Sequence, residues 1–280
     1  MKSVLYSLCR VISMDDIIYR LLLLLNNSRE KNIYHTIART IIEDIKNIPT
    51  MNINKLAQDC YTTPSSVTNF CKKLGYCGFV EFKEYTENIL KSYGIKNSDK
   101  INQISHENLA KPNTDNLLDK VIKDISLANE TIDYRMVDKL VDLIYTHKNI
   151  AMFGTHMSLA LTNGIQTDFF FLGKYINVWS DVKEQYINAG ELDSSYLAII
   201  LSPSGRFLTR SADIMNRLRE NKVKMAFITG QHENVDIHKD DMTIFMSKDK
   251  DTDKYYMTDR YALLYTLDYI LLKYSEKYGN

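Results

Sequence analysis

The spacing of apolar residues changes near residue 149 of the chain. Before this point, apolar residues recur every three or four positions, which is typical of helices that bury one face. After it, short apolar runs alternate with segments of helical spacing, a pattern that indicates parallel strands covered by helices. The sequence therefore predicts an all-α N-terminal domain followed by an α/β domain with a doubly wound parallel sheet.

The predicted elements of the first domain are all helices. The domain is expected to span 1–93, and a linker with the breakers Gly94 and Pro112 is expected at 94–113. The predicted helices cover about 14–25, 33–49, 53–60, 64–74 and 81–90.

The second domain is expected at 114–280. Its predicted strands are 150–153, 175–179, 196–201, 223–229 and 242–246. Its predicted helices are about 115–129, 134–147, 158–172, 207–220 and 258–274. In sheets of this kind, ligands bind beyond the carboxyl ends of the strands.

Residues 53–75 have the pattern of a helix-turn-helix. Ala57 allows a second helix to cross closely, Thr63 is a suitable N-cap, Pro64 suits the first helical position, and Gly75 suits the end. Short polar groups and lysines on the outward face suit DNA bases and phosphates. The candidate DNA-binding residues are Ser65, Ser66, Thr68, Asn69, Lys72 and Lys73. The alternative interpretation is an ordinary helical hairpin with a solvated polar face.

The run from Leu56 to Lys83 resembles the N-terminal domain of RpiR-type (MurR/RpiR) transcriptional regulators. The matching residues are Leu56, Ala57, Val67, Phe70, Cys71, Lys73, Leu74, Gly75, Gly78, Phe79, Glu81, Phe82 and Lys83. The chain departs from the family at Tyr61, where small residues are usual, and at Asn69, where arginine is usual. The resemblance implies double-stranded operator DNA as a partner.

Composition adds little to this picture and contradicts none of it. The 280 residues carry no formal net charge, but residues 1–100 carry +4 and the rest −4, which agrees with a DNA-binding N-terminal part. The four cysteines form no CxxC pair, and the six histidines lack metal-ligand spacing, so we expect free thiols, no metal site and no cofactor. The apolar run Leu21–Leu25 is too short to span a membrane. We expect a cytoplasmic protein with no membrane partner.

Two hydroxyl-rich loops follow the first and third predicted strands. They are Gly154–Ser158 (GTHMS) and Ser202–Gly205 (SPSG), each at the start of a helix, where backbone N–H groups and the helix dipole attract a phosphate. Taken singly, either loop is explained by helix capping. The candidate effector-binding residues are Gly154, Thr155, His156, Ser158, Ser202, Ser204, Gly205 and Arg206.

Together these loops resemble those of the sugar isomerase (SIS) domain, a doubly wound sheet that binds phosphorylated sugars. Gly154, Ser158, Ser202, Ser204 and Gly205 match the family pattern. The chain differs at His156, Pro203 and Phe207, where the family has a second glycine, a residue with an N–H group and a threonine. RpiR-type regulators contain these two domains in this order.

The resemblances imply a transcriptional regulator that senses a phosphorylated sugar, acts as a repressor of sugar-utilisation genes and forms a homodimer or larger homo-oligomer. We predict no catalytic residues and no enzyme activity, because His156 is the only titratable base in either loop and Arg206 stands near the position where SIS enzymes carry an acid. Two alternatives remain. In the first, the chain is a phosphosugar isomerase. In the second, it is a regulator whose SIS-like domain serves only for dimerisation.

Overall fold

The computed structural model describes residues 16–27, 32–92, 117–232, 237–239, 241–246 and 259–279. The chain divides into two compact units after Pro112, and each unit is described here by itself. The predicted linker at 94–113 lies outside the described residues. None of the helices in the described ranges combines the length and the apolar character that crossing a lipid bilayer requires.

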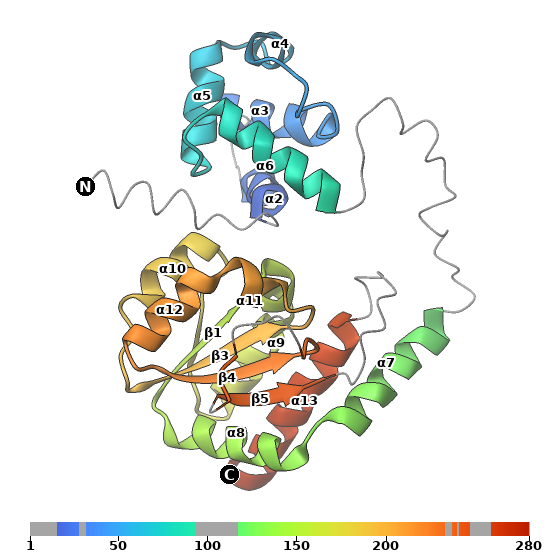
Figure 1. The fold of residues 1–280 in the computed structure, drawn as a ribbon, viewed down its shortest axis with the longest axis vertical. Coiled ribbons are helices and arrows are strands. Elements are labelled where there is room, and N and C mark those ends of the chain that lie inside the picture. Colours follow the sequence, from blue (N-terminus) through green and yellow to red (C-terminus); the bar gives the residue numbers. More distant parts are fainter. Residues whose placement is uncertain are drawn as a thin grey trace. The chain divides into compact units, whose positions relative to one another are not determined.

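The first unit is helical in its described residues (Figure 1). The helix that was predicted to continue to Pro49 ends at Glu43, and a series of turns then returns Ile48 to the core. Asparagine side chains cap two of the helices, since Asn32 and Asn52 each accept backbone N–H groups at a helix start. The helices are α2 (Asp16–Asn27), α3 (Ile33–Glu43), α4 (Ile53–Asp59), α5 (Pro64–Lys73) and α6 (Phe79–Ser92).

A continuous apolar core holds these helices around α5. Val67, Phe70 and Cys71 of α5 are fully buried, and burying a side chain of the size of valine or phenylalanine stabilises a fold by about 1.5–3 kcal/mol. Burial also raises the pKa of the Cys71 thiol to about 12, so this cysteine stays protonated and unreactive. From α2, the buried Arg20 donates a hydrogen bond of 2.5 Å to the carbonyl oxygen of Leu74, at the end of α5. A cation is favourable at that end because the last carbonyls of a helix carry partial negative charge.

The second unit contains a five-stranded parallel sheet, which confirms the predicted fold class. Its strand order is β2-β1-β3-β4-β5, so the chain leaves β1 toward one edge for β2 and returns on the other side for β3. Loops at such a reversal diverge and leave a crevice at the carboxyl ends of the strands. The strands are β1 (Asn149–Gly154), β2 (Ile176–Val178), β3 (Tyr196–Ser202), β4 (Lys224–Thr229) and β5 (Met242–Phe245).

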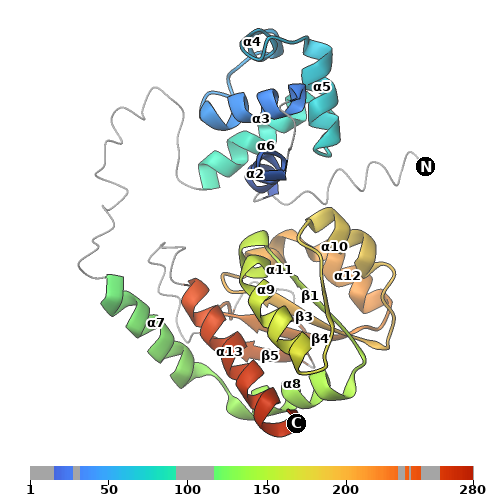
Figure 2. The same ribbon diagram turned by 180° about the vertical axis from the view of Figure 1, so that it is seen from behind.

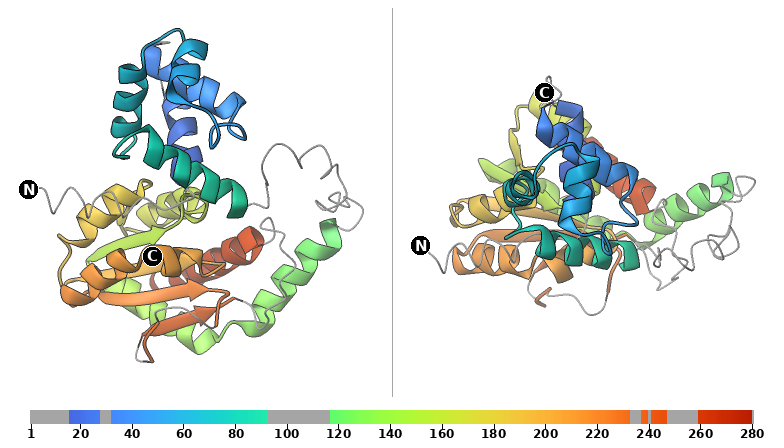
Figure 3. Two further views of the ribbon diagram at one scale, coloured as in Figure 1. Left: turned by 45° about the horizontal axis from the view of Figure 1, so that its top comes forward. Right: turned by 90° about the horizontal axis from the view of Figure 1, so that it is seen from above.

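Helices cover both faces of this sheet (Figure 3, left). In Figure 1, α10 (Val182–Ala189) and α12 (Ala212–Glu220) lie in front of the strands, whereas Figure 2 shows α9 (His156–Phe171) and α13 (Asp259–Tyr278) on the opposite face. The other helices are α7 (Leu117–Thr131), α8 (Tyr134–Thr146) and α11 (Arg206–Arg210).

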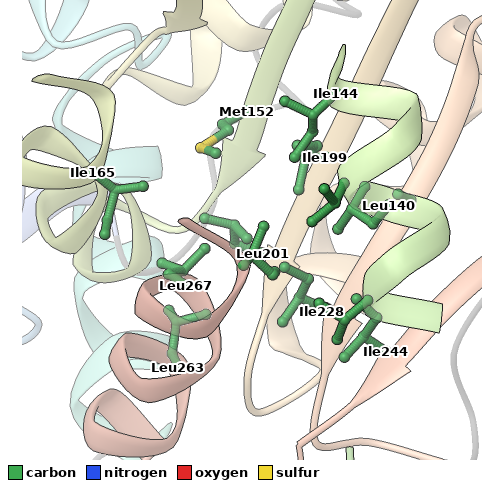
Figure 4. Packing of buried hydrophobic residues seen from close by; sticks show 14 of the residues in the cluster. Leu140, Ile144, Met152, Ile165, Ile199, Leu201, Ile228, Ile244, Leu263 and Leu267 are labelled. Atoms are coloured by element: carbon green, nitrogen blue, oxygen red, sulfur yellow. The ribbon is translucent and has the colours of Figure 1, made fainter. Parts of the chain in front are cut away.

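The larger core lies between the sheet and the helices α8, α9 and α13. Figure 4 shows this packing, in which alternate residues of each strand point to the same face. The labelled side chains are Leu140, Ile144, Met152, Ile165, Ile199, Leu201, Ile228, Ile244, Leu263 and Leu267.

Two features of the second unit differ from the sequence prediction. Helix α10 was not predicted, because it is short, half of its eight residues are polar, and its buried positions include Gln185. The helix predicted at 207–220 is two helices, α11 and α12, that meet at Ser211. Serine competes with the backbone for hydrogen bonds and therefore favours helix ends over interiors.

The contact between Arg20 and the end of α5 leads to a stability prediction. Replacing Arg20 with methionine keeps the side-chain length but removes the charge-assisted hydrogen bond to Leu74, so the first unit should lose about 1.5–3 kcal/mol of unfolding free energy. Urea unfolding followed by circular dichroism measures this loss. The control is Arg39→Ala, which breaks an exposed pair with Glu43 and should cost less than about 0.5 kcal/mol. Equal effects of the two variants would contradict the role of Arg20.

Candidate functional site

The helix-turn-helix consists of α4, a short turn and α5. The Thr63 hydroxyl accepts the Ser66 N–H at 3.2 Å, and Pro64 occupies the first position of α5, as expected from the sequence. At the other end, Gly75 has a φ of 97°, and the Tyr76 N–H donates to the Cys71 carbonyl at 3.0 Å. These contacts fix both ends of α5 and so fix which of its side chains face outward.

Three of the six candidate DNA-binding residues form one exposed stripe along α5. Ser65, Asn69 and Lys72 are exposed, and residues four and seven positions apart lie on the same side of a helix with 3.6 residues per turn. The stripe lies opposite the buried residues Val67 and Phe70. It offers a hydroxyl, an amide and an ammonium group to a partner.

The other three candidates have partners within the chain. Thr68 donates its hydroxyl to the Pro64 carbonyl at 3.0 Å, and the Ser66 hydroxyl lies 3.1 Å from that of Thr63. The Lys73 ammonium lies 4.9 Å from the ring centre of Tyr34, a cation–π contact. We therefore rank Ser65, Asn69 and Lys72 ahead of them as DNA contacts.

The turn before α5 contains a residue in an unusual conformation. Tyr61 has a φ of 52°, in the left-handed region, and its side chain is 95 % exposed. For a residue other than glycine, this conformation costs roughly 1–2 kcal/mol. The sequence marks Tyr61 as a departure from the family pattern, and the structure places that departure at the surface beside α5.

In the second unit, the two hydroxyl-rich loops meet in one cavity at the carboxyl ends of β1 and β3. Its volume is about 40 Å³, which suits an anion the size of a few water molecules, with the remainder of a larger ligand outside it. Five of the eight candidate effector-binding residues line it, namely Thr155, Ser158, Ser202, Ser204 and Arg206. The other described lining residues are Met157, Leu161, Pro203, Arg260 and Leu263.

The first loop is positioned by a side chain that sequence reasoning missed. Gln185 of α10 is completely buried and pairs with Gly154 through two hydrogen bonds, accepting its N–H at 3.1 Å and donating to its carbonyl at 3.0 Å. Gly154 itself is required by space, since a Cβ there would lie 2.8 Å from the Leu201 carbonyl oxygen. No local signal identifies Gln185, because its role depends on where α10 packs.

The hydroxyls of this loop face each other across the first turn of α9. Thr155 caps α9 by accepting the Ser158 N–H at 3.4 Å, and the two hydroxyl oxygens are 3.1 Å apart. Ser158 is almost fully buried. The side chain of His156, another candidate, lies outside the described part of the chain.

The second loop joins β3 to α11. The Ser202 hydroxyl accepts the Leu208 N–H at 3.4 Å, and the Ser202 carbonyl accepts the Thr229 hydroxyl at 2.7 Å. Gly205 has a φ of 74°, which turns the chain into α11. The Ser204 hydroxyl accepts the Arg206 Nε–H at 2.9 Å, so this hydroxyl holds the guanidinium at the cavity wall.

A second arginine reaches the cavity from a distant part of the sequence. Arg260 lies in the first turn of α13, and its Nε is buried without a hydrogen-bond partner in the described residues. A cation at the start of a helix is repelled by the positive end of the helix dipole, so Arg260 contributes nothing to α13 by charge. Both facts favour an anion as its missing partner.

The charge of the cavity indicates its chemistry. Among the described lining residues, the charged groups are the guanidinium groups of Arg206 and Arg260. Guanidinium groups and hydroxyls suit a phosphate, which accepts several hydrogen bonds at once. Within the described residues, no three His, Cys, Asp or Glu side chains gather as ligands for a metal ion.

A larger cavity of about 620 Å³ lies at the opposite end of the strands, near the amino ends of β3 and β4. It is lined by Arg219, Lys222 and Lys224 among other residues, at the C-terminal ends of α8 and α12. Helix C-termini attract cations and disfavour anions, so the basic residues there are explained by the helix ends. The smaller cavity is therefore the better candidate for an anion site.

Comparisons with known proteins agree with both units. Residues 25–92 match the family described as "Helix-turn-helix domain, rpiR family". The chain is 24% identical over 234 residues to the HTH-type transcriptional regulator HexR of Pseudomonas aeruginosa, an alignment that covers 83% of this chain and 80% of that protein.

Solved structures resemble the second unit. The sugar isomerase domain of an RpiR transcription factor from Sphaerobacter thermophilus has a TM-score of 0.51 at 13% identity, and the match covers 60% of this chain and 92% of that one. A putative sugar-phosphate isomerase from Listeria monocytogenes has a TM-score of 0.50 at 15% identity, and the match covers 61% of this chain and 91% of that one. The second unit thus has the fold of a sugar isomerase domain, and the predicted resemblance to RpiR-type regulators is confirmed.

The pairing of Gln185 with Gly154 leads to a second prediction. Gln185→Ala leaves a buried N–H and a buried carbonyl without partners, and should lower the unfolding free energy of the second unit by about 2–4 kcal/mol. The matched control is Asn188→Ala on the same helix. The Asn188 amide donates an exposed hydrogen bond to the Glu184 carbonyl, and its loss should cost less than about 0.5 kcal/mol. Thermal unfolding of both variants tests the assignment, which fails if Gln185→Ala is as stable as the control.

Proposed function

Because residues 25–92 form a helix-turn-helix domain of the rpiR family, we propose that the chain is a DNA-binding transcriptional regulator whose second unit senses a phosphorylated sugar. The observation that carries the sensing role is the cavity where the loops after β1 and β3 meet two arginines. We further propose that the protein is a repressor of sugar-utilisation genes that acts in the cytoplasm.

The DNA-binding role is supported by the exposed face of α5. Asn69 has the amide that pairs with adenine in the major groove, and Lys72 suits a backbone phosphate. Residues 1–100 carry a net charge of +4, which favours approach to DNA. The operator is therefore contacted by Ser65, Asn69 and Lys72, with Ser66, Thr68 and Lys73 at the sides of the stripe.

The sensing role is supported by the donors around the cavity. The hydroxyls of Ser158, Ser202 and Ser204 and the guanidinium groups of Arg206 and Arg260 all donate hydrogen bonds to phosphate oxygens. The small volume holds the phosphate, while the sugar extends into the open mouth of the crevice. The effector is therefore recognised first by its anion.

We propose binding without turnover. Sugar isomerisation needs a general base at the substrate, and the described residues of the cavity wall include neither a carboxylate nor an imidazole. The alternative function, a phosphosugar isomerase, is favoured only by the fold. An assay for sugar interconversion separates the two.

We also propose that the chain forms a homodimer or a larger homo-oligomer. A single helix-turn-helix reads a short half-site, and two-fold symmetry doubles the length of DNA that is read. Large apolar side chains are exposed on the second unit, including Phe170, Phe171 and Leu272, and an exposed apolar patch is typical of an interface.

Lys72 provides the test of the DNA-binding face. The probe is the duplex enriched from a random-sequence pool by the full-length protein. Lys72→Ala should weaken binding to the enriched duplex and to random duplex alike, and should reduce the slope of log affinity against log salt by about one. Lys73→Ala should have a smaller effect, because its ammonium already contacts Tyr34. Unchanged binding after both replacements would exclude α5 as the DNA-binding helix.

Arg260 provides the test of the sensing role. A panel of hexose, pentose and amino-sugar phosphates is first screened by calorimetry, with the unphosphorylated sugars as controls. Arg260→Met should weaken binding of the phosphorylated ligand by about 1.5–3 kcal/mol, or at least tenfold in affinity, because one charge-assisted hydrogen bond is lost. Arg219→Met, which changes an arginine in the opposite cavity, should leave the affinity unchanged.

The same ligand should change the affinity for the enriched duplex, by roughly 5- to 150-fold for couplings of about 1–3 kcal/mol. Turnover of the sugar with no change in DNA affinity would make the chain an enzyme. If no ligand in the panel binds, the second unit serves only for dimerisation.

A further inference from the structure

We propose that Tyr61, in the turn between α4 and α5, donates its phenolic hydroxyl to a phosphate of the DNA backbone. This inference rests on the proposed DNA-binding function and adds a contact outside α5. Neither the pattern of outward residues on α5 nor the family resemblance assigns a role to this position.

The backbone around Tyr61 forms a helix end in which glycine is the preferred residue. The Tyr61 N–H donates to the Gln58 carbonyl at 3.0 Å, and the Thr62 N–H donates to the Ala57 carbonyl at 2.8 Å. This pair of bonds forces a left-handed residue at position 61, where φ is 52°. The same pattern of two hydrogen bonds occurs at the ends of α5 and α9, where the residues in the left-handed region are Gly75 and Gly173.

No burial of the Tyr61 side chain within the fold offsets this strain. Its side chain is 95 % exposed, so it contributes almost no burial. Lys222, with a φ of 56°, occupies the same position after α12, but its charge is favourable beside the negative end of that helix. A neutral, exposed tyrosine has no such compensation, and its side chain is therefore explained by a partner outside the chain.

The position of Tyr61 indicates what that partner is. Tyr61 lies two residues before Thr63, the N-cap of α5, and the exposed stripe starts at Ser65 on the first turn of that helix. A helix that enters the major groove by its N-terminal residues brings the preceding turn close to the sugar-phosphate backbone. Tyrosine hydroxyls are among the groups that contact DNA phosphates, and such contacts position the protein without reading the sequence.

Tyr61→Phe tests the hydroxyl in the full-length protein, with the enriched duplex and random duplex as probes. The variant should bind both duplexes about tenfold more weakly, as expected for the loss of one hydrogen bond to a charged group. The salt dependence should not change, because a neutral hydroxyl displaces no counterion. Lys72→Ala, measured beside it, should lower the salt slope by about one.

Tyr61→Gly separates binding from folding. Glycine relieves the left-handed conformation, so the midpoint of thermal unfolding should rise, while DNA affinity falls at least as far as in Tyr61→Phe. The matched control is Lys222→Gly, which relieves the same conformation in the second unit and should leave DNA affinity unchanged.

Three results would overturn the inference. Unchanged affinity of Tyr61→Phe, while Lys72→Ala is weakened, excludes Tyr61 as a contact and leaves the proposed function intact. A loss confined to the enriched duplex means that Tyr61 reads a base and not a phosphate. If the wild-type protein enriches no duplex, the DNA-binding function itself fails, and the Tyr61 contact fails with it.

Discussion

The close approach of β1 and β3 at their carboxyl ends is the constraint on which the second unit depends. At Gly154 there is no room for a side chain, because a Cβ would lie 2.8 Å from the Leu201 carbonyl oxygen. The glycine therefore lets the two loops converge, and Gln185 satisfies the Gly154 N–H and carbonyl that this convergence would otherwise leave buried and unpaired. This contact holds the ends of β1 and β3 together, and the residues of the two loops that line the cavity follow directly from these ends.

The strand order reverses at β1, since β2 is added on one side of it and β3 on the other, and this makes the contact useful for binding. The connections from β1 and β3 lead to opposite faces of the sheet, so their loops separate and leave space between them. Helix α13, from the end of the chain, then closes one side of the space with Arg260 and Leu263. The result is a cavity that combines donors from three separate segments, which suits an anion with several acceptor oxygens.

The first unit solves a different problem, which is to hold one face of a short helix outward. The core buries Val67, Phe70 and Cys71, and the opposite stripe of Ser65, Asn69 and Lys72 is exposed as a direct consequence. The ends of α5 are secured by Thr63 and by Arg20, which bonds to the Leu74 carbonyl from α2. A helix held at both ends keeps its outward side chains in a fixed register, as recognition of DNA requires.

Local patterns in the sequence determined the elements and much of the sites. The apolar spacing predicted both fold classes, and the capping residues Thr63, Pro64 and Gly75 defined α5 closely, because caps act on neighbouring backbone groups. The two hydroxyl-rich loops were predicted at the starts of helices for the same reason, and the structure brings them together in one cavity. The predicted linker and the side chain of His156 are not tested, since they lie outside the described residues.

Contacts between distant segments were decided only by the tertiary structure. Gln185 lies in a polar helix that shows no clear period, and Arg260 follows the second loop by more than fifty residues, so neither carries a local signal of its role. The break at Ser211 and the internal partners of Thr68 and Lys73 also depend on packing and geometry that spacing does not reveal. The sequence by itself therefore determined most of the helices and all five strands, because these follow from short-range periodicity and capping. Only the folded chain decided which side chains meet, because that depends on how the segments pack in three dimensions.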